Sequence, residues 1–283
     1  MKNIFIIPNK HKDSDYSVSI AAARVLKECG AALYINSEYS TNLEGMAECV
    51  ESIPGFVDLI VVIGGDGSVI DASVIAIEYD IPIIGINLGH LGYLAEIEPT
   101  ELNTLKRIFS GEYSITEKMM LSAAIACEDG NHASSRLAMN DVIISHKTYV
   151  GLAEITLTNS NGASLKYRAD GIVLSTPVGS TAYSLSAGGP IVSHDIDSIL
   201  ATPICPHSFF NRSVIFNPGE CLKLTNNGVD SLSVSVDGRF FMELQKNESC
   251  IVRAATKRLK MLTFRDNNMF SRLFEKMKKL ENI

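Results

Sequence analysis

Residues 58–68 read DLIVVIGGDGS, an apolar run that passes directly into a glycine-rich loop. The apolar run over residues 57–63 is typical of a strand that is buried on both faces. A helical pattern follows Gly67. A buried strand, a turn and a helix in this order form the repeating unit of a parallel sheet covered by helices. The stretch therefore predicts an open α/β domain with a ligand site at the carboxyl end of this strand.

The same alternation of apolar runs and helical stretches fills the first part of the chain. The helix expected over residues 14–29 places Val18, Ala22 and Val25 on one face, and Gly30 suits its left-handed end. The expected strands cover residues 3–7, 31–35, 57–63 and 83–86, and the expected helices cover residues 14–29, 43–51, the stretch after Gly67, and 101–109.

After about Ile115 the hydrophobic period changes to two. Residues 154–158 and 231–236 alternate apolar and polar side chains, as strands with one buried face do. Asn161-Gly162 and Asp237-Gly238 follow these runs and favour tight hairpin turns. Many short strands separated by turns predict an all-β, sandwich-like domain with antiparallel strands.

The length of 283 residues suggests two domains, at about 150 residues per domain. We expect an α/β domain over residues 1–114 that carries the glycine-rich loop, and a β-sandwich-like, dinucleotide-binding domain over residues 115–256. We expect the segment 257–283 to return to the first domain. Within it, residues 267–280 have helical spacing and predict a helix that packs back on that domain. The overall class is α+β.

Charge, apolar run length and cysteine spacing disfavour several classes of protein and site. A formal net charge of −7 disfavours a nucleic-acid surface. The longest apolar runs fall far short of the roughly 20 residues of a membrane span, and no signal peptide is visible, so we expect a cytoplasmic protein without membrane contact. The six cysteines form no Cys-x-x-Cys pair, which favours buried, reduced thiols over a zinc site or a disulfide framework.

The glycine-rich loop is the first candidate for chemistry. Gly64, Gly65 and Gly67 allow a ligand to approach the backbone closely, and the amides at the start of the next helix suit a phosphate. A carboxylate here, Asp66, repels phosphate unless it holds a metal ion or accepts a proton from a hydroxyl. The alternative is that Asp66 caps the helix.

Two later segments are candidates for binding. The Asn140-Asp141 pair offers the hydrogen-bonding groups that an adenine edge and ribose hydroxyls require, although such a pair also occurs in ordinary turns. Residues 170–190 are dense in hydroxyls and glycines around Tyr183. They suit a pocket in which the tyrosine ring faces a planar ligand, and the alternative is a serine-rich loop with Tyr183 in the core.

Together these segments resemble the NAD kinase family over nearly the whole chain. Family members carry a Gly-Gly-Asp-Gly-Thr loop, an Asn-Glu or Asn-Asp pair and a Thr-Pro-x-Gly-Ser-Thr-Ala-Tyr-x-x-Ser-x-Gly-Gly stretch, in that order. This chain has Ser68 in place of the loop threonine, and its residues 176–189 match the third pattern. Residues 85–94 resemble the Gly-x-Asn-x-Gly-x-Leu-Gly-Phe-Leu run of the family. The family fold is an α/β domain joined to a β-sandwich.

The resemblance implies transfer of the γ-phosphoryl group of ATP to the 2′-hydroxyl of the adenosine ribose of NAD, with a divalent cation, Mg²⁺, as cofactor. It makes Asp66 the catalytic residue and leaves the metal ligands open. It also implies a homodimer or homotetramer in which Arg168 and Asp170 lie near a subunit interface. The phosphate loop is Gly64, Gly65, Gly67 and Ser68, and the residues matched to the NAD site are Gly67, Asn140, Asp141, Arg168, Asp170, Thr181, Ala182, Tyr183, Ser184, Ser186, Cys205 and Arg239.

Two other functions remain open at this point. A lipid or other small-alcohol kinase shares the Gly-Gly-Asp-Gly loop but has no need of the two later segments. A non-enzymatic dinucleotide-binding module keeps the pocket but has no use for a carboxylate at Asp66. For Arg239, contact with the ligand and a solvated place in a hairpin turn are the two alternatives.

Overall fold

The computed structural model describes residues 1–43, 45–89, 93–125, 134–147, 151–207 and 211–264. The chain divides into two compact units. The first unit contains Met1–Glu117 and the described residues from Leu259 onward, and the second unit is Lys118–Arg258. The chain thus leaves the first unit once and returns to it after completing the second.

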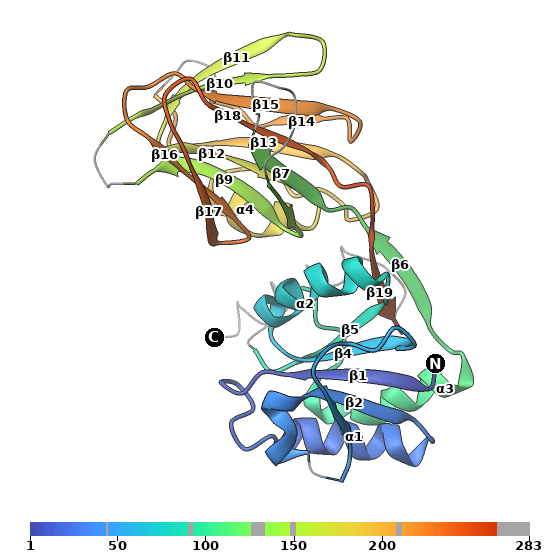
Figure 1. Ribbon diagram of the computed structural model, residues 1–283. Helices are drawn as coiled ribbons and strands as arrows, with labels where there is room; N and C mark the ends of the chain where they lie inside the picture. The colour runs from blue at the N-terminus through green and yellow to red at the C-terminus, as the bar shows by residue number, and fades with distance from the viewer. Residues whose placement is uncertain (44, 90–92, 126–133, 148–150, 208–210, 265–283) are drawn as a thin grey trace, which may run out of the picture. The chain divides into compact units, whose positions relative to one another are not determined.

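The first unit is built on a seven-stranded sheet with the strand order β3-β2-β1-β4-β5-β19-β6. The pairings of β1 with β2 and β4, of β2 with β3, and of β5 with β4 and β19 are parallel. Figure 1 shows α1 and α2 on opposite faces of this sheet. The elements are β1 (Asn3–Pro8), α1 (Ser17–Glu28), β2 (Ala32–Asn36), the 3₁₀ helix η1 (Ser37–Asn42), β3 (Glu48–Val50), β4 (Leu59–Gly64), α2 (Asp66–Tyr79), β5 (Ile83–Asn87), the 3₁₀ helix η2 (Pro99–Lys106), α3 (Arg107–Ser110), β6 (Ser114–Lys118) and β19 (Leu259–Thr263).

Burial on both faces explains the continuous apolar strands. Every residue of β4 and of β5 is buried. On one face, Ala22 and Leu26 of α1 pack with Ile4 and Ile6 of β1 in the same apolar cluster. The buried carboxylate of Asp13 accepts hydrogen bonds from the amide and hydroxyl of Ser19, which fixes the start of α1.

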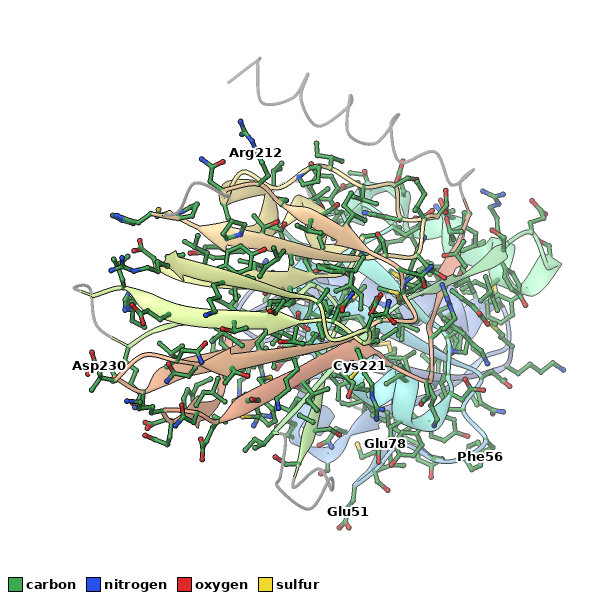
Figure 2. The ribbon with its side chains drawn as sticks, turned by 90° about the horizontal axis from the view of Figure 1, so that it is seen from above. Glu51, Phe56, Glu78, Arg212, Cys221 and Asp230 are labelled. Atoms are coloured by element: carbon green, nitrogen blue, oxygen red, sulfur yellow. The ribbon has the colours of Figure 1, made fainter. Side chains whose placement is uncertain are left out.

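The helix predicted over residues 43–51 is wrong. The segment instead contains β3, which pairs with β2 at Tyr34↔Glu48 and Ile35↔Cys49 and so extends the sheet by one strand. Gly45 has a φ of +74°, a left-handed conformation that interrupts a helix. Glu51, labelled in Figure 2, follows directly after this edge strand.

The helix predicted over residues 101–109 forms as two short elements, η2 and α3. A non-helical backbone at Glu101, with φ −111° and ψ 17°, kinks η2 near its start. The side chain of Glu101 accepts a hydrogen bond from the amide of Glu98, which completes a capping box in front of Pro99. The predicted helical segment is therefore present, but its first part is a 3₁₀ helix that begins two residues earlier than expected, at the capped Pro99.

The second unit consists of two six-stranded antiparallel sheets with orders β11-β10-β15-β18-β7-β8 and β14-β13-β12-β9-β16-β17. A single apolar cluster takes side chains from both sheets, such as Leu121 and Ile155 from one and Ile144 and Val234 from the other. The elements are β7 (Leu121–Ile125), β8 (Ser135–Ala138), β9 (Asp141–His146), β10 (Ala153–Thr158), β11 (Ser164–Ala169), β12 (Gly171–Ser175), the 3₁₀ helix η3 (Gly179–Thr181), α4 (Tyr183–Ser186), β13 (Ile199–Ile204), β14 (Val214–Phe216), β15 (Cys221–Asn226), β16 (Leu232–Val236), β17 (Arg239–Leu244) and β18 (Ser249–Ala254).

Both predicted hairpins form. β10 pairs with β11 across Asn161-Gly162, and β16 pairs with β17 across Asp237-Gly238. The predicted parallel α/β sheet and antiparallel β-sandwich are confirmed, whereas the helix expected over 267–280 lies outside the described residues. Within the described part of the chain, no helix has the length and apolar character needed to cross a membrane.

The cysteines are only partly as expected. Those in the described residues are free thiols, but Cys49 and Cys205 are exposed rather than buried. Cys49 lies on the edge strand β3, and Cys205 follows the end of β13 with a φ of +44°. Loops and edge strands offer less cover than the sheet interior, where Cys250 is buried.

Candidate active site

In the first unit, the Gly-Gly-Asp-Gly loop joins the buried end of β4 to the first turn of α2. Gly64 has no room for a side chain, because a Cβ there would overlap the Oγ of Ser68. The loop is tied to the end of β1 by Asn9, whose amide donates to Ser68 Oγ at 2.7 Å and whose backbone N–H donates to the Ile63 carbonyl at 2.8 Å. Two neighbouring parallel strands thus bring their carboxyl-end loops together, as expected for a ligand site in such a sheet.

Asp66 is the first residue of α2, and it does not cap the helix. The cap position is occupied by Gly65, so no side chain caps the first amides of the helix. The Asp66 carboxylate instead accepts hydrogen bonds from the backbone amides of Tyr93, at 2.7 Å, and Leu94, at 3.1 Å. The alternative of Asp66 as a helix cap is therefore wrong, and the carboxylate is held in place by a segment that follows β5.

The half-buried Asp66 keeps acceptor capacity for a ligand. An ionised carboxylate has about four lone-pair sites, and the two amides use one on each oxygen. Burial, and then the nearby Asp66 charge, raise the pKa of the Tyr93 hydroxyl above its ordinary value. The carboxylate thus has oxygens that can accept a proton or a hydrogen bond from a hydroxyl.

Lys12 lies over the same loop, although no sequence motif points to it. A Cβ built on Gly65 would overlap the Lys12 Nζ, and a Cβ on Gly89 would lie 3.2 Å from it. No carboxylate among the described residues lies within ion-pair distance of this ammonium. The strand order explains its position. β1 lies beside β4, and Lys12 follows the end of β1 by four residues, so it lies at the same edge of the sheet as the glycine-rich loop.

In the second unit, Asn140 and Asp141 stand at the start of β9. Opposite them, β12 ends at Ser175, which pairs with Asp141. The Thr176 Oγ1 donates to the Met139 carbonyl at 2.6 Å, and the Thr176 amide donates to the Asn140 carbonyl at 2.9 Å. The sequence-predicted pair and the beginning of the 176–189 stretch are thus brought together.

Asp141 is an unusual carboxylic acid because it is only 4% exposed. Burial, and then the negative charge of Asp237, raise the pKa of the Asp141 carboxyl to about 7. At neutral pH its neutral and ionised forms are therefore both populated, so the group can donate as well as accept a hydrogen bond.

Most hydroxyls of the 176–189 stretch form hydrogen bonds within the protein. Ser180 Oγ donates to the Pro177 carbonyl at 2.6 Å, and the buried Ser184 Oγ shares a hydrogen bond of 3.0 Å with Thr202. Gly189 has no room for a side chain because Ser184 and Thr202 fill that space. These small residues therefore build a compact support for α4, and Ser184 contributes to it from within.

Tyr183 lies on the surface of this support and is 46% exposed. This excludes the alternative in which its ring fills the core. Ser186 is exposed as well, and Thr181 and Ala182 are half-buried. The ring, Ala182 and the Ser186 hydroxyl are accessible in the second unit, which is what a planar ligand needs.

The remaining predicted site residues occupy other edges of the second unit. Arg168 pairs with Glu154 at 3.4 Å on the surface of β10 and β11. The Asp170 amide donates to the Ile204 carbonyl, one residue before Cys205, so Asp170 and Cys205 are neighbours. Arg239 is exposed and begins β17. The structure therefore joins Asn140 to the start of the 176–189 stretch and places Asp170 beside Cys205.

A preformed metal cage is absent from the described residues, where no group of three His, Cys, Asp or Glu side chains could hold a metal ion. Mg²⁺ fits the remaining donor set nonetheless, because it usually binds one or two carboxylates together with substrate phosphates and waters. Asp66 is the carboxylate of the glycine-rich loop and retains free lone pairs.

Comparison with known proteins finds two family models that match successive parts of the chain. The family model for the ATP-NAD kinase N-terminal domain matches residues 4–113, and the model for the ATP-NAD kinase C-terminal domain matches residues 139–264. The NAD kinase of Lachnoclostridium phytofermentans is 35% identical over 277 residues, which cover 95% of this chain and 96% of the relative. The NAD kinase of Caldanaerobacter subterraneus subsp. tengcongensis is 32% identical over 281 residues, covering 98% and 99%.

Solved structures share the fold. Yeast NADH kinase complexed with NADH superposes with a TM-score of 0.85 at 22% identity, over 100% of this chain and 88% of that one. An NAD kinase from Archaeoglobus fulgidus in complex with ATP has a TM-score of 0.72 at 19% identity, over 98% of each chain. With both domain models matched and relatives above 30% identity along nearly its full length, this chain belongs to the NAD kinase family.

Proposed function

We propose that this chain is an ATP-dependent NAD kinase that phosphorylates the 2′-hydroxyl of the adenosine ribose of NAD to give NADP. The observation that carries the proposal is the carboxylate of Asp66, held at the carboxyl end of β4 with lone pairs free for a hydroxyl. Membership of the NAD kinase family supports the same substrates. No feature of the described residues favours a lipid kinase or a non-catalytic module.

Asp66 is proposed as the catalytic residue. Its carboxylate accepts a hydrogen bond from the 2′-hydroxyl, orients the oxygen and takes up its proton as the reaction proceeds. A bond forms between that oxygen and the γ-phosphorus, the bond from the γ-phosphorus to the β–γ bridging oxygen breaks, and the electron pair leaves with ADP. Phosphoryl transfer depends mainly on positioning and charge stabilisation, and one oriented carboxylate suits such a reaction.

The triphosphate is proposed to bind the loop formed by Gly64, Gly65, Gly67 and Ser68. The first-turn amides of α2 lack a side-chain cap and point toward the ligand, as helix N-termini do. The ammonium of Lys12 lies over Gly65 and supplies a positive charge at this loop. Bound Mg²⁺ would be held by Asp66 and phosphate oxygens, and would neutralise phosphate charge.

The dinucleotide is proposed to bind the second unit. Asn140 and Asp141 hold the adenosine part through an amide and a carboxyl group, and Tyr183 stacks on a planar ring. Thr181, Ala182 and Ser186 line the same surface, while the buried Ser184 supports it. Direct contacts by Cys205 and Arg239 stay predictions.

Assembly and location are also proposals. We propose a homodimer or homotetramer in which Arg168 and Asp170 complete a site of a neighbouring subunit, as the family resemblance implies. The side chain of Arg168 is 64% exposed in one chain, which supports a contact with another subunit. A cytoplasmic location stays a prediction.

The test is direct. Purified protein is incubated with NAD, ATP and MgCl₂, and the product is coupled to an NADP-specific dehydrogenase. We expect a signal that depends on all three components. Absence of NADP together with turnover of a lipid alcohol would overturn the proposal in favour of the lipid kinase.

A further inference from the structure

The carboxylate of Asp237 collects three consecutive backbone amides from a segment almost a hundred residues away. Its Oδ2 accepts from Met139 N at 2.8 Å, and its Oδ1 accepts from Asn140 N at 2.8 Å and Asp141 N at 3.0 Å. Successive amides that point to one centre form a nest that favours an anion. Here the anion is part of the protein.

The carbonyls of the same three residues are also engaged. Thr176 binds the carbonyls of Met139 and Asn140 through its hydroxyl and its amide, and the Asp237 amide donates to the Asp141 carbonyl at 2.9 Å. Gly179 closes the segment from another side, because a Cβ at Gly179 would overlap the Asn140 carbonyl oxygen. Every backbone N–H and carbonyl of residues 139–141 thus has a hydrogen-bond partner.

The side chain of Asn140 is left for a ligand. The side-chain amide of Asn140 makes no hydrogen bond to any residue that the structure describes, whereas its backbone N–H and carbonyl are both hydrogen-bonded. A half-buried amide with a rigid backbone and no partner of its own is pre-organised for binding, because little conformational entropy remains to be lost.

We propose that Asp237 is a positioning residue for the dinucleotide: its carboxylate fixes the Met139–Asp141 backbone and so aims Asn140 and Asp141 at NAD. This rests on the proposed function, in which Asn140 and Asp141 hold the adenosine part. Asp237 itself acts through these residues.

The hairpin turn alone does not account for a carboxylate at this position. Asp237 has a φ of +47° and Gly238 a φ of +75°, the two left-handed residues of a type I′ turn. Asn-Gly suits this turn as well as Asp-Gly does. An asparagine at 237 would therefore keep the turn but lose the charge and one of its two acceptor oxygens, which separates the two roles.

The experiment compares the Asp237→Asn and Asp237→Ala variants with the wild-type protein in the NADP-forming assay. We expect the KM for NAD to rise about threefold in Asp237→Asn and about tenfold or more in Asp237→Ala, with kcat and the KM for ATP within about twofold, because only uniform binding of one substrate is lost. Asn159→Ala is the matched control. Its Oδ1 accepts the amides of Asn161 and Ala163 in the hairpin of the other sheet, so its loss should leave the KM for NAD unchanged.

A purely structural role predicts a different result. Fewer folded molecules lower the apparent kcat and leave both KM values unchanged, and this outcome, or an equal KM for NAD in all variants, overturns the proposal. If wild-type protein forms no NADP, the proposed function fails instead. Calorimetric titration with NAD then tests Asp237 separately, and equal Kd values for wild type and Asp237→Ala overturn the positioning role.

Discussion

The backbone amide of Tyr93 donates a hydrogen bond of 2.7 Å to Oδ2 of Asp66, across 27 positions of sequence. With the bond from Leu94 to the other oxygen, it orients the carboxylate without any contribution from a ligand. The sequence motif is therefore local, but the geometry of its acid depends on the segment after β5.

Asp66→Asn should reduce kcat by about 100-fold or more, because an amide cannot take the proton of the attacking hydroxyl. The Kd for NAD should stay within about threefold of wild type, because the dinucleotide contacts are proposed to lie in the second unit. Steady-state kinetics and NAD titration measure the two quantities. Asp80→Asn, at the other end of α2 in a left-handed position that asparagine tolerates, is the control and should keep full activity. Unchanged turnover in Asp66→Asn would exclude the catalytic role.

Lys12→Ala should raise the KM for ATP about tenfold, which corresponds to about 1.4 kcal/mol, while the KM for NAD stays unchanged. The reason is the loss of the ammonium that lies over Gly65 and Gly89. Because salt screens exposed charges, the difference from wild type should shrink as ionic strength rises. Lys10→Ala, two residues earlier and also exposed, serves as control. Equal ATP kinetics for the two variants would remove Lys12 from the phosphate site.

Asp141 should make the stability of the protein depend on pH. Its pKa is about 7 in the fold against an ordinary value of 3.8, so the folded state binds the extra proton between about pH 4 and pH 7. The contribution is full below about pH 4 and is lost as pH rises through about 7, with a slope of up to about −1.4 kcal/mol per pH unit.

Urea unfolding of wild type and Asp141→Asn at several pH values measures this contribution as a difference. Relative to the variant, the wild-type free energy of unfolding should fall between pH 5 and pH 7, and the variant should lack this component. Parallel pH profiles for the two proteins would show that Asp141 titrates near its ordinary pKa.

Gly179→Ala should lower the free energy of unfolding by about 2 kcal/mol or more, because the new methyl group meets backbone atoms that cannot move aside. The nearest of these belong to Asn140, so the KM for NAD should rise together with the loss of stability. Gly55→Ala is the matched control, because a Cβ at Gly55 meets no atom within 4 Å. Thermal unfolding compares the two, and equal melting temperatures would contradict the packing described around Asn140.

The elements that could be predicted from the sequence are those with a strong local pattern. The continuous apolar run of β4 and the alternation in β10 and β16 follow directly from which faces are buried. Residues 43–51 could not be predicted in this way. Their conformation depends on pairing of β3 with β2 and on the left-handed Gly45, and neither is visible in hydrophobic spacing.

The candidate site divides in the same manner. Motifs pointed to Asp66, Asn140 and Tyr183 as candidates, because their residue types and spacing are local features of the sequence. No motif pointed to Lys12 or Asp237 as a candidate site residue, because each contacts a segment more than fifty positions away. The density of hydroxyls in 176–189 was correctly noticed, but most of them turned out to satisfy buried backbone groups, which only the fold determines.

The position of β19 has a consequence for how the chain is made. β19 pairs with β5 at Met261↔Ile83, and its Leu259 and Leu262 are buried, so this late segment separates β5 from β6 in the first sheet. During translation β5 leaves the ribosome first. Its edge can pair with β19 only after the whole of Lys118–Arg258 has also been synthesised. A nascent chain interrupted anywhere in that interval carries an open sheet edge, which makes it a target for chaperones and proteases.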